Sequence, residues 1–157
     1  MDLKTILATI QTDLKNSTTL SYVSDTNIFI TPDEDIIPVG TTFPAIGLKD
    51  GPERYERDPV QMPADRWDMA AFIIQAIIYV ELSAGATPVI GQTTPTVIKG
   101  ILDICTDVDA VLESKYSAIA GVEDFRILDS GASEIVGSRD LVWLKKTRLY
   151  EYSVVKP

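Results

Sequence analysis

Residues 66–82 read RWDMAAFIIQAIIYVEL, and the conformation of this stretch decides the fold. In an α-helix, its apolar residues would form one stripe from Met69 to Val80. In a β-strand, every second residue from Ala70 to Leu82 would form a wholly apolar face, with a mixed face behind it. Five β-branched residues and three aromatics favour the strand, whereas the length of the run favours the helix. We expect a long strand that lies on a helix layer and turns its mixed face towards another subunit, with the helix as the alternative.

The first of two expected helices lies at the start of the chain. Its apolar residues repeat at the spacing of one helical face, with Asp2 placed to cap the first turn. The stripe consists of Leu3, Ile6, Leu7, Ile10 and Leu14.

The second helix is expected to open at Thr94-Pro95, a cap residue followed by proline at the first helical position. Its apolar stripe would begin with Val97 and Ile98 and run to Leu112. Cys105 lies in this stripe and is therefore expected to be a small core residue.

Strands are expected before and after these elements, at 27–30, 43–49, 122–128 and 134–136, and a long one at 141–155. The order is helix, strands, helix, strands. We therefore expect a single α+β domain over residues 1–157, with a mixed, mainly antiparallel sheet, two helices packed on one face, and an extended strand–loop–strand arm.

Residues 49–68, KDGPERYERDPVQMPADRWD, are a charged, Pro-rich loop or hairpin arm. The arm has no visible core of its own, and arginine and aromatic residues are enriched at interface hot spots. Subunit or partner contacts are therefore expected here, with a flexible charged loop as the alternative. The candidate residues are Arg54, Tyr55, Arg57, Arg66 and Trp67.

The charge balance excludes several classes of partner. With 23 acidic and 14 basic side chains, the net charge is −9, which repels nucleic acid and anionic membrane. The only basic cluster is Lys145-Lys146-Thr147-Arg148, which we expect to be the solvated face of a strand rather than a binding patch. The apolar run from Met69 to Val80 is shorter than the roughly 20 residues that span a bilayer. The start of the chain lacks the apolar core of a secretory signal, so synthesis in a reducing cytoplasm is expected.

Candidate catalytic and metal-binding groups are few. The absence of histidine removes Ser-His and Cys-His pairs and most zinc sites. Residues 127–136, ILDSGASEIV, resemble the catalytic loop of retroviral-type aspartic proteases, which would use Asp129 in a symmetric dimer. Only 28 residues follow Asp129, too few for the flap of such an enzyme, so we expect Asp129-Ser130-Gly131 to be a hairpin turn. Asp33-Glu34-Asp35 lacks calcium-loop spacing and is expected to be a solvated turn. We expect no catalytic residue, no metal site and no cofactor.

The order of elements resembles that of the tail terminator proteins of long-tailed bacteriophages, the minor tail protein U family. The likeness rests on the first helix, on residues 43–48 entering the charged arm, on residues 67–82 leaving it, and on the second helix and the last strand. It is a match of pattern and order over most of the chain, without a short diagnostic motif.

The resemblance implies a structural virion protein of the tail or neck, assembled in the host cytoplasm. Members of the family form a homohexameric ring that caps the tail tube, ends its polymerisation and joins the head connector. The implied partners are other copies of the chain, the tail tube protein and the connector, with DNA only passing through the lumen. The acidic balance suits such a passage, because it lets DNA slide without sticking. The alternatives are a neck or tail-completion adaptor and, more remotely, the dimeric aspartic protease.

Overall fold

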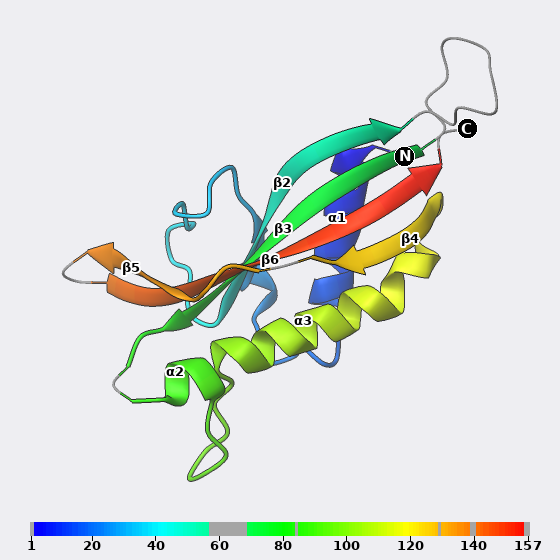
Figure 1. The fold of residues 1–157 in the computed structure, drawn as a ribbon. Coiled ribbons are helices and arrows are strands. Elements are labelled where there is room, and N and C mark those ends of the chain that lie inside the picture. The colour runs from blue at the N-terminus through cyan, green and yellow to red at the C-terminus, as the bar shows by residue number, and fades with distance from the viewer. Residues whose placement is uncertain (1, 57–68, 84, 129, 139–140, 156–157) are drawn as a thin grey trace, which may run out of the picture.

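The computed structural model describes residues 2–56, 69–83, 85–128, 130–138 and 141–155. Figure 1 shows a long, twisted sheet with helices on one side of it. The helices are α1 (Leu3–Lys15), α2 (Thr87–Ile90), α3 (Ile101–Lys115) and two 3-10 turns, η1 (Asp25–Asn27) and η2 (Tyr116–Ala118). The strands are β1 (Ile28–Ile30), β2 (Ala45–Glu56), β3 (Met69–Glu81), β4 (Val122–Ile127), β5 (Glu134–Ser138) and β6 (Leu141–Val155).

The strands form one mixed sheet in the order β1-β2-β3-β6-β4, and β5 also pairs with β6. β1 runs parallel to β2, and every other pair is antiparallel. The α+β fold class, the mainly antiparallel sheet and the helix layer on one face are therefore confirmed. β6 has its predicted bounds, and the strand predicted at 43–49 runs on as far as Glu56.

β3 occupies the centre of the sheet, and the strand expected within residues 66–82 is confirmed from Met69 to Glu81. It pairs with β2 along one edge and with β6 along the other. Its β-branched and aromatic side chains pack on both sides of the pleat, which explains why an almost continuous apolar run forms a strand here. Trp67 lies outside the described residues.

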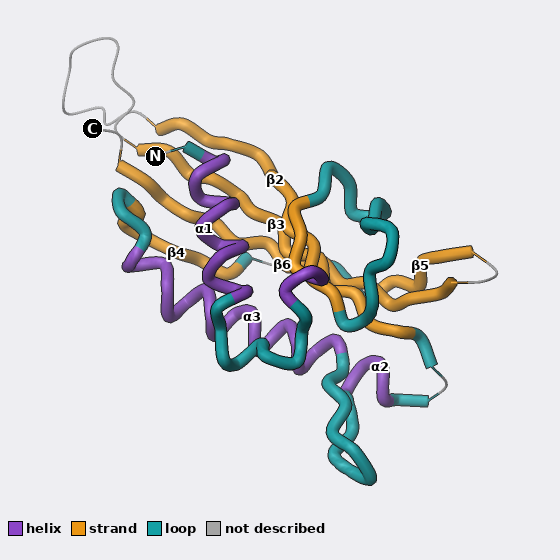
Figure 2. The backbone as a smooth tube through the Cα atoms, turned by 180° about the vertical axis from the view of Figure 1, so that it is seen from behind, coloured by secondary structure: helices purple, strands orange, loops and turns teal. Residues whose placement is uncertain are grey.

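The helix layer covers the face of β3 that carries Phe72, Ile74 and Ile78. The view from behind in Figure 2 shows α1 in front of the strands and α3 running along below them, and side chains of both helices belong to the same core. α1 presents the stripe predicted from the sequence, and the Thr5 backbone N–H donates to Asp2 Oδ1 at 2.7 Å, which confirms the cap. The thiol of Cys105 is buried in the same core, as expected.

The predicted start of the second helix is wrong. α3 begins at Ile101, and Gly100 precedes it as the N-cap residue, with its backbone N–H donating to Asp103 Oδ2 at 3.0 Å. Residues 92–98 instead form a small hairpin closed by a bridge between Gln92 and Ile98. Because that bridge uses backbone groups that a helix would need, the helix does not extend back from Ile101 to Val97 and Thr94. The short helix α2 was not predicted.

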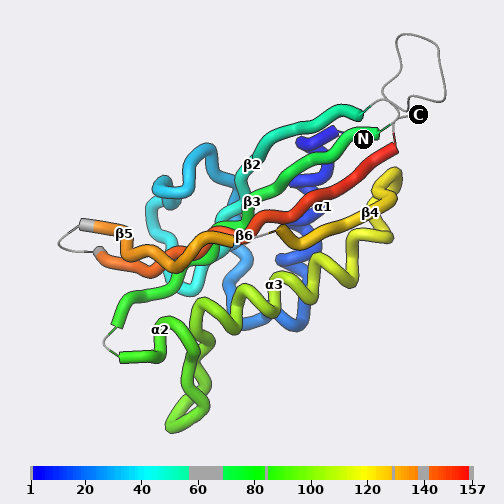
Figure 3. The backbone as a smooth tube through the Cα atoms, in the orientation of Figure 1, coloured from blue at the N-terminus to red at the C-terminus, as the bar shows by residue number. Residues whose placement is uncertain are grey.

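The second face of the sheet is covered at one end by the chain itself. Phe29, Ile77 and Tyr79 form a small core there, and Phe43 stacks on Trp143 at 6.0 Å between ring centroids. Figure 3 shows the segment between β1 and β2, in cyan, lying beside the strands at this end. The far face of β3 is thus covered near Tyr79 by the chain's own loop. Contact of this face with another subunit stays a prediction for the end of β3 near Met69.

β4 and β5 follow one another along the same edge of β6. β4 pairs with residues 150–154 of β6, and β5 pairs with residues 141–145. The two strands therefore run in one direction, and the hairpin turn predicted at Asp129-Ser130-Gly131 is wrong. Ser130 and Gly131 belong to a short interruption between two collinear strands, whereas Asp129 lies outside the described residues.

Candidate subunit-contact site

The predicted contact residues are only partly within the described structure. Arg54 and Tyr55 lie on the second half of β2, which stays paired with β3 up to Glu56 after a register shift between Asp50 and Glu53. Arg57, Arg66 and Trp67 lie outside the described residues. The structure therefore brings Arg54 and Tyr55 to the end of the sheet and says nothing of the other three.

The Tyr55 side chain packs against the sheet and does not stand on an isolated arm. Its ring meets Phe72 edge-on, with 6.5 Å between centroids, and its hydroxyl donates to the Glu53 carboxylate. This hydrogen bond raises the pKa of Tyr55. The ring remains 41% exposed, so the residue keeps a surface for contact with another molecule.

A hollow of about 550 Å³ lies beside Arg54, on the sheet face opposite the helices. Met69 and Ala71 of β3 are among its lining residues. Its charged lining comes from three strands and is of both signs, namely Arg54, Glu56, Asp124, Arg126 and Glu151. Such a surface is suited to a protein partner with matching charges, because the charges of both signs limit repulsion.

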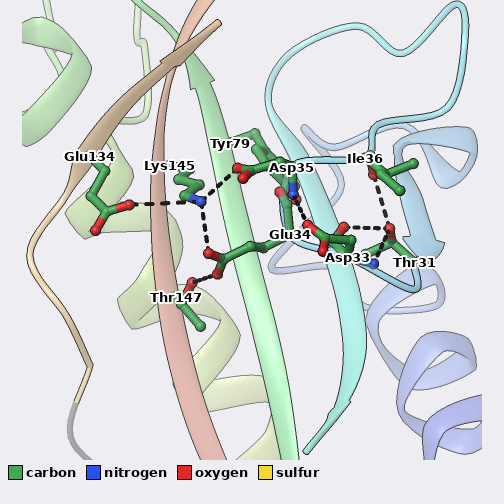
Figure 4. Close-up of polar contacts among 9 residues, drawn as sticks. All are labelled: Thr31, Asp33, Glu34, Asp35, Ile36, Tyr79, Glu134, Lys145 and Thr147. Carbon is green, nitrogen blue, oxygen red and sulfur yellow. Dashed lines mark hydrogen bonds and ion pairs between the residues drawn. The ribbon is translucent and has the colours of Figure 1, made fainter.

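A buried lysine holds the other end of this face together. Figure 4 shows Lys145 of β6 between carboxylates from two separate segments. Its Nζ lies 2.8 Å from Asp35 Oδ1, 3.0 Å from Glu34 Oε1 and 3.7 Å from Glu134 Oε2. The Tyr79 hydroxyl donates to the Glu34 backbone carbonyl at 2.5 Å. These contacts tie the segment before β2 to β5 and β6.

The environment of this cluster shifts two pKa values. Burial lowers the pKa of Lys145, but hydrogen bonds to Asp35 and Glu34 and their charges offset burial and raise it overall. Burial and the nearby acidic turn raise the pKa of the Tyr79 hydroxyl. Asp33-Glu34-Asp35 is thus an exposed turn that also serves as the counter-charge for a buried cation. No pattern in the sequence pairs Asp35 with a lysine 110 residues away.

The solvated basic face expected at residues 145–148 is wrong for its two ends. Arg148 turns towards the helix layer and forms an ion pair with Asp109 of α3, where Nε donates to Oδ1 at 3.2 Å. The Tyr150 hydroxyl donates to the same carboxylate at 2.6 Å. Lys146 donates to the Gly131 carbonyl at 2.7 Å. Alternate strand positions point to opposite faces of the sheet. Lys145 therefore meets the acids of the turn before β2, and Arg148 meets the acid of α3.

The protease-like segment is held by one of these residues. Arg148 Nη1 donates to Ser130 Oγ at 3.3 Å. The strands on both sides of the segment pair with β6 rather than with each other. The reactive carboxylate of the resemblance, Asp129, falls outside the described residues.

Within the described ranges, no group of three or more Asp, Glu or Cys side chains is placed to hold a metal ion. Among the same residues, no helix has the length and apolar character needed to cross a bilayer.

A comparison with models of protein families found no match for this chain. A search of the curated proteins found no relative either.

Proposed function

We propose that the chain is a structural subunit of a long-tailed phage particle, which closes with other copies into a hexameric ring on the tail tube. The ring ends tube polymerisation and gives the head connector a surface to join. The subunit acts by shape and surface complementarity, with no cofactor.

The observation that carries the proposal is the sheet face opposite the helices. Among the described residues, which do not include 57–68, the loop before β2 covers this face near Tyr79. The charged hollow beside Arg54 lies on the same face at the other end of the sheet. Arg54 beside this hollow favours a protein-binding surface, because arginine is enriched at interface hot spots. Tyr55, whose ring meets Phe72, lies towards the helix-covered face at the same end of the sheet.

The lateral strands support closure into a ring. β1 pairs with β2 only along Ile46–Leu48, and β4 lies at the end of the strand order on the other side. Sheet edges on two sides of one subunit suit head-to-tail contact, which closes into a ring when the rotation fits. The net charge of −9 suits a ring through which DNA passes.

The proposal is tested with tube subunits taken from the genome that encodes the chain. The tubes should stop growing and carry a ring at one end when the purified protein is added, as seen by negative-stain electron microscopy. Tubes that keep growing, with no protein bound, would contradict the proposal. Binding to the connector alone would assign the chain to the neck adaptors.

The contact residues are tested in the same assay. Arg54→Ala and Tyr55→Ala should weaken capping while the subunit stays folded, because both side chains are exposed. Lys4→Ala on the exposed side of α1 is the matched control and should cap normally. A Tyr55→Ala subunit that unfolds would mean that the ring on Phe72 is core instead. A strict dimer in light scattering would call for Asp129→Asn with a peptide substrate.

A further inference from the structure

Residues 82–98, LSAGATPVIGQTTPTVI, are the longest run of the chain without a charged side chain. The run covers 17 residues in a protein in which 24% of residues are charged. It includes α2 and the hairpin closed by Gln92 and Ile98. In Figure 2 the part after α2 projects from the body of the molecule, away from the sheet.

This surface gathers exposed aliphatic side chains. Five large ones lie on α2, on the hairpin and on the first turn of α3, and they are between 38% and 72% exposed. They are Val89, Ile90, Val97, Ile98 and Leu102. Single exposed aliphatics are ordinary, but five of them on and next to a run without charged residues favour an interaction site. We call these five residues the aliphatic patch.

The backbone beneath the patch is fixed by its own hydrogen bonds. The Gln92 N–H donates to the Ile98 carbonyl at 2.8 Å, the reverse bond measures 2.9 Å, and the Gly91 N–H donates to the Thr87 carbonyl at 2.9 Å. A Cβ added to Gly100 would lie 2.5 Å from the Val89 carbonyl oxygen, so α2 and the start of α3 approach as closely as glycine allows. A surface held in this way loses little conformational entropy when it binds.

We propose that the aliphatic patch is a contact between two copies of this chain. The choice of partner follows from charge. Each copy carries a net charge of −9, so two copies repel where their acidic surfaces meet. Interface cores are depleted in charged residues, and contacts between like subunits are the most apolar. The nearest cation, Lys99, is already paired with Asp107 at 3.1 Å.

Other occupants fit this surface less well. Nucleic acid and anionic lipid need basic side chains, and the run from residue 82 to residue 98 supplies none. A typical interface uses roughly 20–30 residues a side. The patch would therefore be the apolar centre of a larger contact. The choice of a second copy also rests on the ring of the proposed function.

The test uses two variants that place a carboxylate in the patch, Ile90→Asp and Val97→Asp. Both side chains are more than half exposed, at 62% and 72%, so the folded subunit should tolerate the change. Val39→Asp is the matched control, because Val39 is also an exposed aliphatic but lies on the loop between β1 and β2, away from the patch and from the outer edge strand β4. Circular dichroism and urea unfolding should be unchanged for all three variants.

Native mass is measured by light scattering over a concentration series. The wild type and Val39→Asp should associate, while Ile90→Asp and Val97→Asp should associate about tenfold or more weakly, since each ring contact would bury an unpaired carboxylate. Patch variants that associate as tightly as the wild type would overturn the inference and leave the proposed ring intact.

Two other results would also overturn the inference. One is a wild type that stays monomeric at every concentration, whether or not it caps tubes. The other is a patch variant that still associates but no longer binds tubes, because the patch would then face the tube. Failure of the proposed function is read separately, from tube length with the wild-type protein.

Discussion

Replacing Lys145 by methionine removes the cation from the cluster in Figure 4 and keeps most of the buried stem. The main loss is the charge-assisted hydrogen bond to Asp35, 2.8 Å long, which contributes about 1.5–3 kcal/mol. The pairs with Glu34, at 3.0 Å, and with the more distant Glu134 each add about 0–1 kcal/mol. The carboxylates left behind are 42% to 67% exposed, so water hydrates them and the larger penalty of an isolated buried charge does not arise. We expect a loss of about 2 kcal/mol.

Thermal and urea unfolding of Lys145→Met measure this loss. For a domain of this size, about 2 kcal/mol lowers Tm by about 4–8 °C. The pH dependence has a definite sign. Because the folded pKa of Lys145 lies above the ordinary value of 10.5, its contribution is fully present at neutral pH and is lost as pH rises through the folded pKa. The difference between wild type and variant should therefore shrink above about pH 10.5.

Lys146→Met is the matched control, since this neighbouring lysine makes one hydrogen bond to a backbone carbonyl and is less buried. It should cost under about 1 kcal/mol. A Lys145→Met protein within about 0.5 kcal/mol of the wild type would refute the reasoning, because surface substitutions commonly stay within that range.

Three further predictions concern the helix side of the molecule. Asp109→Asn removes the carboxylate that accepts from both Arg148 and Tyr150, and should lower the free energy of unfolding by about 2–3 kcal/mol, measured from the urea midpoint; an unchanged midpoint would contradict it. Gly91→Ala should lower the free energy of unfolding more than Gly40→Ala does. Both glycines have positive φ, at 73° and 85°, but only at Gly91 would a Cβ meet other atoms, so equal losses would argue against the close approach. Burial raises the pKa of the Cys105 thiol to about 11, so a thiol reagent at pH 8 should label this residue only after the protein unfolds. Rapid labelling of the folded protein would exclude this burial.

The main architecture could be predicted because it depends on local patterns. The stripe of α1 and the bounds of β6 follow from spacing, whereas for β3 the β-branched and aromatic residue types favour a strand over a helix. The start of α3 could not be predicted in this way. Its apolar spacing continues back to Val97, but the backbone approach of Gly91 and Gly100 stops the helix, and spacing carries no sign of that contact.

The candidate site was less predictable for a related reason. Lys145 and Arg148 read as one basic cluster along the chain, yet they point to opposite faces of β6 and pair with acids far away in the sequence. The spacing of Val97 and Ile98 predicts a helix core, so it does not predict their exposure. The absence of charge from residue 82 to residue 98 is visible in the sequence, but the largely buried run from residue 69 to residue 80 shares it.

β6 also sets the order of events during synthesis. It pairs with β3 on one edge and with β4 and β5 on the other, and it follows all three in the chain. Met69 pairs with Val155, which follows it by 86 residues, so the centre of the sheet can form only after Val155 has been synthesised. Until then β3 is an apolar strand with one open edge, the kind of surface that chaperones hold on a nascent chain. The centre of the sheet therefore closes only once β6 has left the ribosome, and the folded surface that the proposed ring needs does not exist before that point.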